Sequence, residues 1–149
     1  MIRKIQRKDG FTFLEIMFVV VIIGILLSLA TPNLFKWVNQ AKVQTTKANM
    51  KTIQLALAGY ELNVGNCPDT VQGLEALVEC PADIDENSWG DEPYFDDGAV
   101  PKDGWKNDYL YMSPGDHLPK YDLWSKGKDQ KDGTTDDIHN WMEQAEEEL

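Results

Sequence analysis

The sequence predicts an α+β protein in which a long N-terminal helix packs on a small domain with a short helix and an antiparallel β-sheet. Residues 11–30 are a nearly uninterrupted apolar run of 20 residues, long enough for a helix that crosses a bilayer. Residues 33–62 continue it with a helical apolar pattern and no glycine before Gly59. From residue 63 onward, glycine, proline and aspartate separate short apolar segments, which is typical of a small domain.

Charge is segregated along the chain. Residues 1–10 carry a net charge of +3, and residues 31–60 carry four lysines and no acidic residue. From Glu61 onward there are 23 acidic and 6 basic residues. This acidic C-terminal half would repel phosphates, which disfavours nucleic acid as a partner, so we expect none. The charge is compatible with a soluble extracytoplasmic domain or with cation binding.

The apolar run is best explained as a membrane segment with its basic flank in the cytoplasm and the C-terminal domain on the far side. An ordinary signal peptide is cut after its apolar stretch, and Leu29-Ala30-Thr31 could serve as such a site. Glu15 argues against that interpretation, because a carboxylate inside an apolar run costs a few kcal/mol unless it is neutralised or paired. Cleavage after Gly10 would supply the partner, since it creates a free amine on Phe11. That amine lies one helical turn from Glu15 of the same chain, or it can meet Glu15 of a neighbouring subunit.

The segment GFTFLEIMFVVVIIGILLSLATPNLF resembles the class III signal of type IV pilins and type II secretion pseudopilins. The resemblance implies a leader at 1–10, cleaved between Gly10 and Phe11 by a prepilin peptidase, and N-methylation of Phe11. It also implies that Glu15 recruits subunits and sets their register in a filament. The alternative is a plain membrane anchor with a stray glutamate.

The long helix is expected to have a transmembrane half at 11–31 and an amphipathic half at 32–63. Pro32 cannot donate a hydrogen bond to Ser28, so the helix is expected to bend or loosen over 24–32 and thereby to help assembly. The simpler alternative is that Pro32 marks the exit from the membrane. An apolar stripe at Ile53, Leu57 and Tyr60, and a narrower one at Leu34, Val38 and Ala41, predict packing faces.

The four lysines of this half, at positions 36, 42, 47 and 51, have no acidic residue near them in sequence. They form either a solvated face with contacts to lipid headgroups or a surface that attracts the acidic domains of neighbouring subunits.

Residues 64–149 are predicted to form the globular domain. A short amphipathic helix is expected over 70–79, with Asp69 or Thr70 as its N-cap. Cys67 and Cys80 flank it, and in an exported domain a disulfide between them is the expected state. Two free thiols are the alternative.

A long loop is expected over 81–108, held to the core by four aromatic residues, Trp89, Tyr94, Phe95 and Trp105. Residues 108–113 and 121–125 predict a β-hairpin around Pro114 and Gly115. A third strand is expected either near Val100 or at 138–141. The motifs QGLEALVE, DGWKNDYLYMSPG, YDLWSKGKD and TDDIHNW resemble successive motifs of the G-subunit family of type II secretion, which implies a type IV pilin-like fold.

The acidic loop KGKDQKDGTTDDI at 126–138 is a candidate cation site. Calcium takes six to eight oxygen ligands, but the spacing does not match an EF-hand, so a solvated acidic turn is the better explanation from residues alone. The resemblance implies instead a structural Ca2+ site. Its implied side-chain ligands are Asp129, Asp136 and Asp137, Asp132 is a solvated turn residue, and backbone oxygens come from Lys126, Thr134 and Ile138.

The function expected is a structural subunit, not an enzyme. The resemblance implies a periplasmic pseudopilus, a homopolymer with minor pseudopilins on an inner-membrane assembly platform, that drives folded exoproteins through the outer membrane. A type IV or competence pilin is the nearest alternative. His117 and His139 lie in no catalytic motif, which disfavours a membrane-anchored enzyme, and an anchored calcium-binding module that never polymerises is disfavoured by Glu15.

Overall fold

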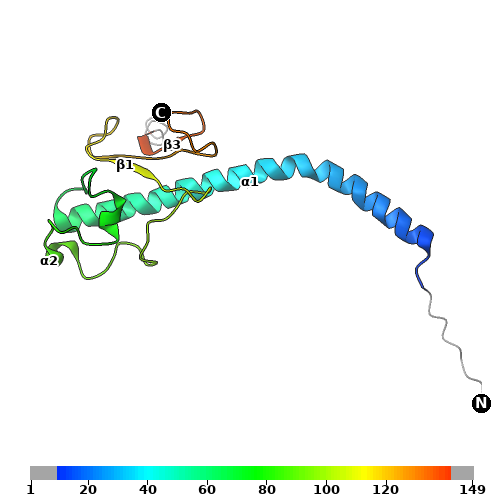
Figure 1. The fold of residues 1–149 in the computed structure, drawn as a ribbon, viewed down its shortest axis with the longest axis horizontal. Helices are drawn as coiled ribbons and strands as arrows, with labels where there is room; N and C mark the ends of the chain where they lie inside the picture. Colours follow the sequence, from blue (N-terminus) through cyan, green and yellow to red (C-terminus); the bar gives the residue numbers. More distant parts are fainter. Residues whose placement is uncertain (1–9, 142–149) are drawn as a thin grey trace, which may run out of the picture. The chain divides into compact units, whose positions relative to one another are not determined.

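The computed structural model describes residues 10–141, and of residues 28–33 only the backbone. The predicted leader therefore lies outside the described residues except for Gly10, as does the side chain of Pro32. The chain divides into two compact units, residues 1–38 and 39–149. The element order is α1 (Phe13–Val64), the 3-10 helix η1 (Leu74–Leu77), α2 (Glu86–Trp89), β1 (Leu110–Met112), β2 (Asp122–Ser125) and β3 (Ile138–His139) (Figure 1).

Helix α1 runs without a break for 52 residues. It starts at Phe13 because Thr12 caps it: the Thr12 hydroxyl accepts a hydrogen bond from the amide of Glu15 at 3.2 Å. It ends at Val64, and Gly65 follows with φ 101°, a conformation that favours glycine and stops a helix. Residues 24–32 stay helical within α1, since a proline removes only one backbone donor, and the bend expected there stays a prediction. Searched over the described residues, no helix is both long and apolar enough to span a bilayer.

The core of the second unit lies between α1 and the segments that follow it. The stripe predicted at Ile53, Leu57 and Tyr60 is buried, with at most 1% of each residue exposed. It packs with residues from the rest of the domain, Met50, Leu74, Leu77, Trp89, Phe95, Tyr109, Leu123 and Ile138. The predicted packing face of the helix is thereby confirmed. In the first unit, Leu34 and Val38 are exposed at 55% and 45%.

The helix predicted over 70–79 is wrong in kind and length. The structure has a turn over residues 70–73 and then the four-residue η1. Gly73 breaks the helical path because its φ is 63°. The carboxylate of Asp69 accepts from the amides of Val71 and Gln72 at 2.8 and 2.7 Å, so it caps the turn rather than a helix.

The cysteines that flank this segment are both free thiols, so the disulfide predicted from the sequence is not formed in the structure. They lie in different surroundings. Cys80 Sγ contacts the carbonyls of Pro81 and Ile84 at 3.6 and 3.7 Å, whereas Cys67 lies beside Glu61 and Lys120. Burial raises the pKa of both thiols, which favours their protonated form at neutral pH.

The sheet has three antiparallel strands in the order β1-β2-β3 (Figure 1). The β1–β2 hairpin was predicted, and its register pairs Leu110 with Trp124 and Met112 with Asp122. The third strand comes from the 138–141 alternative, where His139 pairs with Trp124. Leu123 points into the core and is fully buried, so Trp124 and His139 lie on the opposite face of the sheet.

The loop at 81–108 contains one helical turn, α2, that was not predicted. Two of its four predicted anchors, Trp89 and Phe95, are buried at 6% exposure, and Tyr94 and Trp105 are half-buried. Trp89 is fixed further by its indole N–H, which donates to the carbonyl of Ala76 at 2.7 Å.

Candidate functional site

The first candidate region is the N-terminal part of α1. Every large apolar side chain described from Phe11 to Leu27 is exposed, with values from 46% for Val19 to 83% for Phe13. An apolar surface of this extent needs lipid or other chains to cover it. Glu15 lies among these residues and is itself exposed.

The predicted cleavage site lies just before the helix. Phe11 is not helical in the structure, because the capping hydroxyl belongs to Thr12. The pairing expected from the sequence requires the amine that cleavage creates, so it stays a prediction for the processed chain. Thr12 stays in the chain after a cut between Gly10 and Phe11, so processing would leave the cap of α1 intact.

The second candidate region is the 126–138 loop. Its ends meet where Ser125 pairs with Ile138 between β2 and β3. Gly127 opens the loop with φ 62°, and its backbone lies so close to the carbonyl of Asp136 that a side chain at this position would clash with it. Only glycine fits there without strain.

Backbone amides hold the predicted ligands in place. One oxygen of Asp136 accepts from the amides of Lys128 and Asp129 at 2.7 and 3.0 Å. One oxygen of Asp137 accepts from the amides of Gly133 and Thr134 at 2.7 and 3.1 Å. Hydrogen bonds from the hydroxyl of Thr134 and from the amides of Asp129 and Lys128 lower the pKa of Asp136, so this carboxyl group is ionised at neutral pH.

Three carboxylates converge on the hydroxyl of Thr134. Its oxygen lies 2.7 Å from Asp136, 3.3 Å from Asp129 and 3.3 Å from Asp137. A hydroxyl has one proton and can donate to one of them at a time. Several carboxylate oxygens gathered around one proton repel one another, and this is the oxygen-rich environment that a hard cation such as calcium prefers.

The donor chemistry of the loop therefore fits calcium. Within residues 10–141, however, no group of three or more His, Cys, Asp or Glu side chains is already spaced as a metal centre. The carbonyl of Thr134, one of the three predicted backbone ligands, accepts from the amide of Asp137 at 3.3 Å. Lys126 and Ile138, the other two, stand at the two ends of the loop beside the β2–β3 pair.

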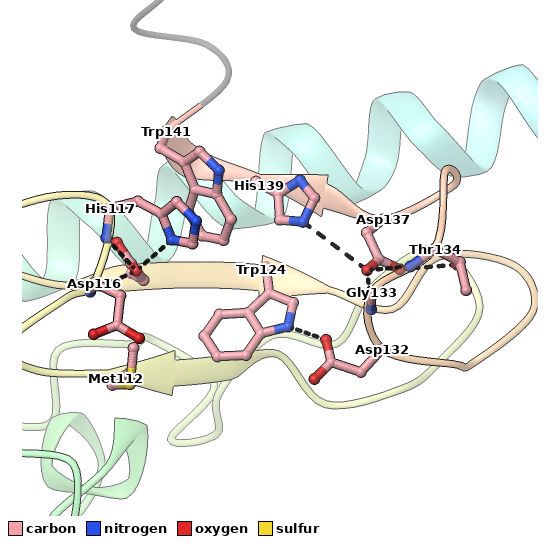
Figure 2. A pocket seen from close by; sticks show the side chains of 11 residues that line it. Met112, Asp116, His117, Trp124, Asp132, Gly133, Thr134, Asp137, His139 and Trp141 are labelled. Atoms are coloured by element: carbon pink, nitrogen blue, oxygen red, sulfur yellow. Dashed lines mark hydrogen bonds and ion pairs between the residues drawn. The ribbon is translucent and has the colours of Figure 1, made fainter.

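Next to the loop, the outer face of the sheet carries a groove lined by aromatic and acidic side chains (Figure 2). The ring of His117 stacks on Trp141 with 4.1 Å between centroids, and His139 contacts the same indole at 4.2 Å. The indole N–H of Trp124 donates to Asp132 at 2.8 Å (Figure 2). Asp132, predicted to be a solvated turn residue, is exposed but has this specific partner.

Asp122 lines the groove and is buried, with 1% of the residue exposed. Its carboxylate accepts from the amides of Asp116, His117 and Leu118, each at 2.9 Å, and from the imidazole of His117 at 2.9 Å. Burial alone would raise the pKa of Asp122, but these hydrogen bonds outweigh it and lower the pKa. Asp122 thus clamps the β1–β2 connection.

Each of the two histidines lies beside a carboxylate. His117 bonds to Asp122, and His139 Nε2 lies 3.9 Å from Asp137. Burial lowers the pKa of His139 and His117 lowers it further, while Asp137 opposes both. The thiols are placed elsewhere, against Pro81 and Ile84 for Cys80 and beside Glu61 for Cys67.

Sequence reasoning missed the Thr134 hydroxyl, the Asp122 clamp and the pairing of Trp124 with Asp132. Only Asp122 left a signal in the sequence, because a charged residue between Tyr121 and Leu123 in an apolar strand needs a partner. The other contacts depend on which residues the folded loop brings together.

Comparison with known proteins decides the family. The profile for type II secretion system protein G matches residues 33–141, and the profile for the prokaryotic N-terminal methylation motif matches residues 5–31. This chain belongs to the type II secretion system protein G family. The match favours this family over the type IV pilin alternative.

Members of the protein G family in several bacteria are similar over nearly the whole chain. The type II secretion system core protein G of Pseudomonas aeruginosa is 42% identical over 140 residues, which cover 91% of this chain and 96% of that protein. The core protein G of Escherichia coli strain K12 is 43% identical over 141 residues, covering 93% of this chain and 94% of that protein.

A solved structure of the same kind is similar in fold. It is the crystal structure of the major pseudopilin from the type 2 secretion system of enterohaemorrhagic Escherichia coli. The TM-score is 0.62 at 30% identity, covering 76% of this chain and 97% of that chain. The predicted pilin-like α+β fold is thereby confirmed.

Proposed function

We propose that this chain is a structural subunit of the periplasmic pseudopilus of a type II secretion system, which polymerises to drive folded exoproteins through the outer membrane. The observation that carries the proposal is the exposed apolar surface of α1 between Phe11 and Leu27, with the single carboxylate of Glu15 inside it. Such a surface is stable only when lipid or further copies of the chain cover it. The methylation-motif match over residues 5–31 supports the same assignment.

Processing prepares the segment for assembly. A prepilin peptidase removes residues 1–10 and leaves Phe11 as an N-methylated amine. The positive amine pairs with Glu15 of a neighbouring subunit, because a carboxylate in an apolar setting needs an opposite charge. The uncut chain has no such amine, so only processed subunits pair in this way.

Before assembly the subunit is a single-pass protein of the bacterial inner membrane, with its N-terminus in the cytoplasm and residues 64–149 in the periplasm. The basic residues at 3, 4, 7 and 8 set this orientation. The assembly platform draws subunits from the bilayer into a homopolymer that also contains minor pseudopilins. The chain's own role is structural, and no catalytic step is assigned to it.

Assembly is tested by cross-linking in cells that produce the full chain with the secretion machinery. We expect a ladder of multimers from the wild type and none from Glu15→Ala, with the variant still present in the membrane fraction. Glu79→Ala removes an exposed carboxylate of the globular domain and is the matched control, which we expect to give the wild-type ladder. An unchanged ladder from Glu15→Ala would show that this carboxylate does not direct assembly.

We further propose that the 126–138 loop binds Ca2+ as a structural ion. The side chains of Asp129, Asp136 and Asp137 would hold it, with backbone oxygens of Lys126, Thr134 and Ile138. The convergence of the three carboxylates on the hydroxyl of Thr134 supports this assignment. When bound, the ion supplies a charge that screens the carboxylates and closes the loop.

Calcium binding is tested by thermal melting of the full chain in detergent, with calcium chloride or with a chelator. We expect calcium to raise the melting temperature of the wild type, since a ligand that binds only the folded state stabilises it. Asp136→Ala should abolish the rise. Asp132→Ala removes the same charge from the same loop without removing a proposed ligand, and it should keep the rise; the reverse pattern would refute the assignment.

A further inference from the structure

The turn at residues 102–109 is fastened to α1 at several points. The amide of Gly104 donates to the hydroxyl of Thr46 at 2.9 Å, and the hydroxyl of Tyr109 donates to the carbonyl of Thr46 at 2.7 Å. Asn49 donates to the carbonyl of Lys102 at 2.7 Å. A side chain at Gly104 would collide with the carbonyl of Lys42, so the turn lies directly on the helix backbone.

Asp103 organises this turn from inside the protein. Its carboxylate is buried, with 4% of the residue exposed, and it has no ion pair within residues 10–141. One oxygen accepts from the amides of Trp105 and Asn107 at 2.9 and 2.8 Å. The other accepts from the hydroxyl of Ser125 at 2.7 Å. Burying a charge costs free energy unless hydrogen bonds compensate it, so the loss of any one of these bonds would destabilise the turn.

Ser125 connects the turn to the acidic loop. It is fully buried at the end of β2, and its hydroxyl both donates to Asp103 and accepts from the amide of Gly127 at 3.2 Å. Gly127 in turn lies against the carbonyl of Asp136. A continuous path thus runs from the loop through Ser125 to Asp103, and from the adjacent Gly104 to Thr46 of α1.

We propose that Asp103 is a positioning residue that couples the 126–138 loop to helix α1, so that cation binding by the loop and docking of the 102–109 turn on the helix stabilise each other. The coupling to a cation rests on the proposed calcium site, whereas the path itself consists of contacts within this chain. A cation bound in the loop would also stabilise the buried negative charge of Asp103 by electrostatic attraction, because Asp103 lies only two contacts from the loop. Coupling of this kind is reciprocal, so disturbing either end changes the other.

The coupling is tested by hydrogen–deuterium exchange on the full chain in detergent, with and without calcium chloride. In the wild type we expect calcium to slow exchange of the peptides that cover 42–50 and 103–107 by ~5-fold or more. Ser125→Ala should lose that protection while calcium still slows exchange in the loop. Asp103→Asn keeps the size of the side chain but replaces an acceptor by a donor, and we expect it to weaken the protection too.

Thr46→Val and Thr45→Val form a matched pair. Both hydroxyls donate to the carbonyl four residues before them, but only Thr46 also accepts from Gly104. Thr46→Val should lose the calcium protection of 103–107, and Thr45→Val should keep it. Protection confined to the loop in the wild type would overturn the coupling and leave calcium binding intact.

A calcium-free comparison separates the two proposals. If calcium slows no exchange in the wild type, the calcium proposal fails. The coupling is then tested without calcium, by comparing the exchange rates of loop amides in the Thr46 and Thr45 variants. Thr46→Val should then speed exchange at Lys128 and Asp129 by ~5-fold or more relative to Thr45→Val. Equal rates in the two variants would overturn the coupling.

Discussion

Three connections within the globular domain each depend on one polar side chain. Thr134 gathers the carboxylates of the 126–138 loop, Ser125 connects that loop to Asp103, and Asp122 clamps the β1–β2 connection. Thr134 and Asp122 have partners within six residues in sequence, whereas Ser125 bonds to Asp103, 22 residues away. A buried polar group without a hydrogen-bond partner would destabilise the domain. Losing one of these few contacts would therefore lower the free energy of unfolding.

The lowered pKa of Asp122 predicts how the free energy of unfolding depends on pH. Its pKa in the folded chain lies below the ordinary value of 3.8, so its contribution is complete at neutral pH and is lost as the pH falls below 3.8. Asp122→Asn should lower the free energy of unfolding at pH 7 by about 3 kcal/mol, because three backbone amides lose their charged acceptor.

This prediction is checked by urea unfolding at a series of pH values. The difference between the wild type and Asp122→Asn should shrink as the pH falls through that range. Asp116→Asn replaces an exposed carboxylate on the same connection and should unfold like the wild type. A difference that is independent of pH would mean that the carboxylate is not ionised in the folded chain.

At the scale of elements, long periodic patterns were predictable and short segments were not. The helical stripe of Ile53, Leu57 and Tyr60 identified the buried face of α1 because it repeats over several turns. The helix expected at 70–79 failed because Gly73 adopts a positive φ, and α2 escaped notice because four residues carry no periodic signal. The hairpin was recognisable from its alternating strands around Pro114 and Gly115.

The sequence indicated which residues of the 126–138 loop belong to the candidate site, but not which side chains of the domain contact one another there. The resemblance of the 126–138 loop to its family indicated which carboxylates gather, and the structure does bring Asp129, Asp136 and Asp137 together. The link from Ser125 to Asp103 joins residues 22 apart, and nothing in the local sequence shows that their side chains meet. Contacts of this kind follow from tertiary packing alone.

The packing of α1 gives a stability prediction with a matched control on the same helix. Leu57 is fully buried, whereas Leu55 is 75% exposed. Leu57→Ala should destabilise the domain by about 2–5 kcal/mol, since it removes buried methyl groups and leaves a cavity. Leu55→Ala should change stability by less than about 0.5 kcal/mol. Urea unfolding of the two variants checks this, and equal effects would show that the face is assigned wrongly.

At the scale of the whole molecule, the charge pattern and the exposed apolar segment describe a chain built to meet different surroundings along its length. The first unit exposes apolar side chains that need lipid or other copies, and the acidic second unit presents a surface suited to water and cations. The charge pattern and the apolar segment are visible in the order of residues along the sequence, and the structure shows that the apolar side chains are exposed. The family match over residues 33–141 then connects them to protein secretion.

We infer that cutting after Gly10 creates the amine that pairs with Glu15 and so permits assembly. Mass spectrometry of the N-terminal peptide from cross-linked multimers, compared with the peptide from the monomer in the membrane fraction, tests this. We expect subunits in multimers to begin at N-methylated Phe11 and uncut chains to remain monomeric. Multimers whose subunits still begin at Met1 would contradict it.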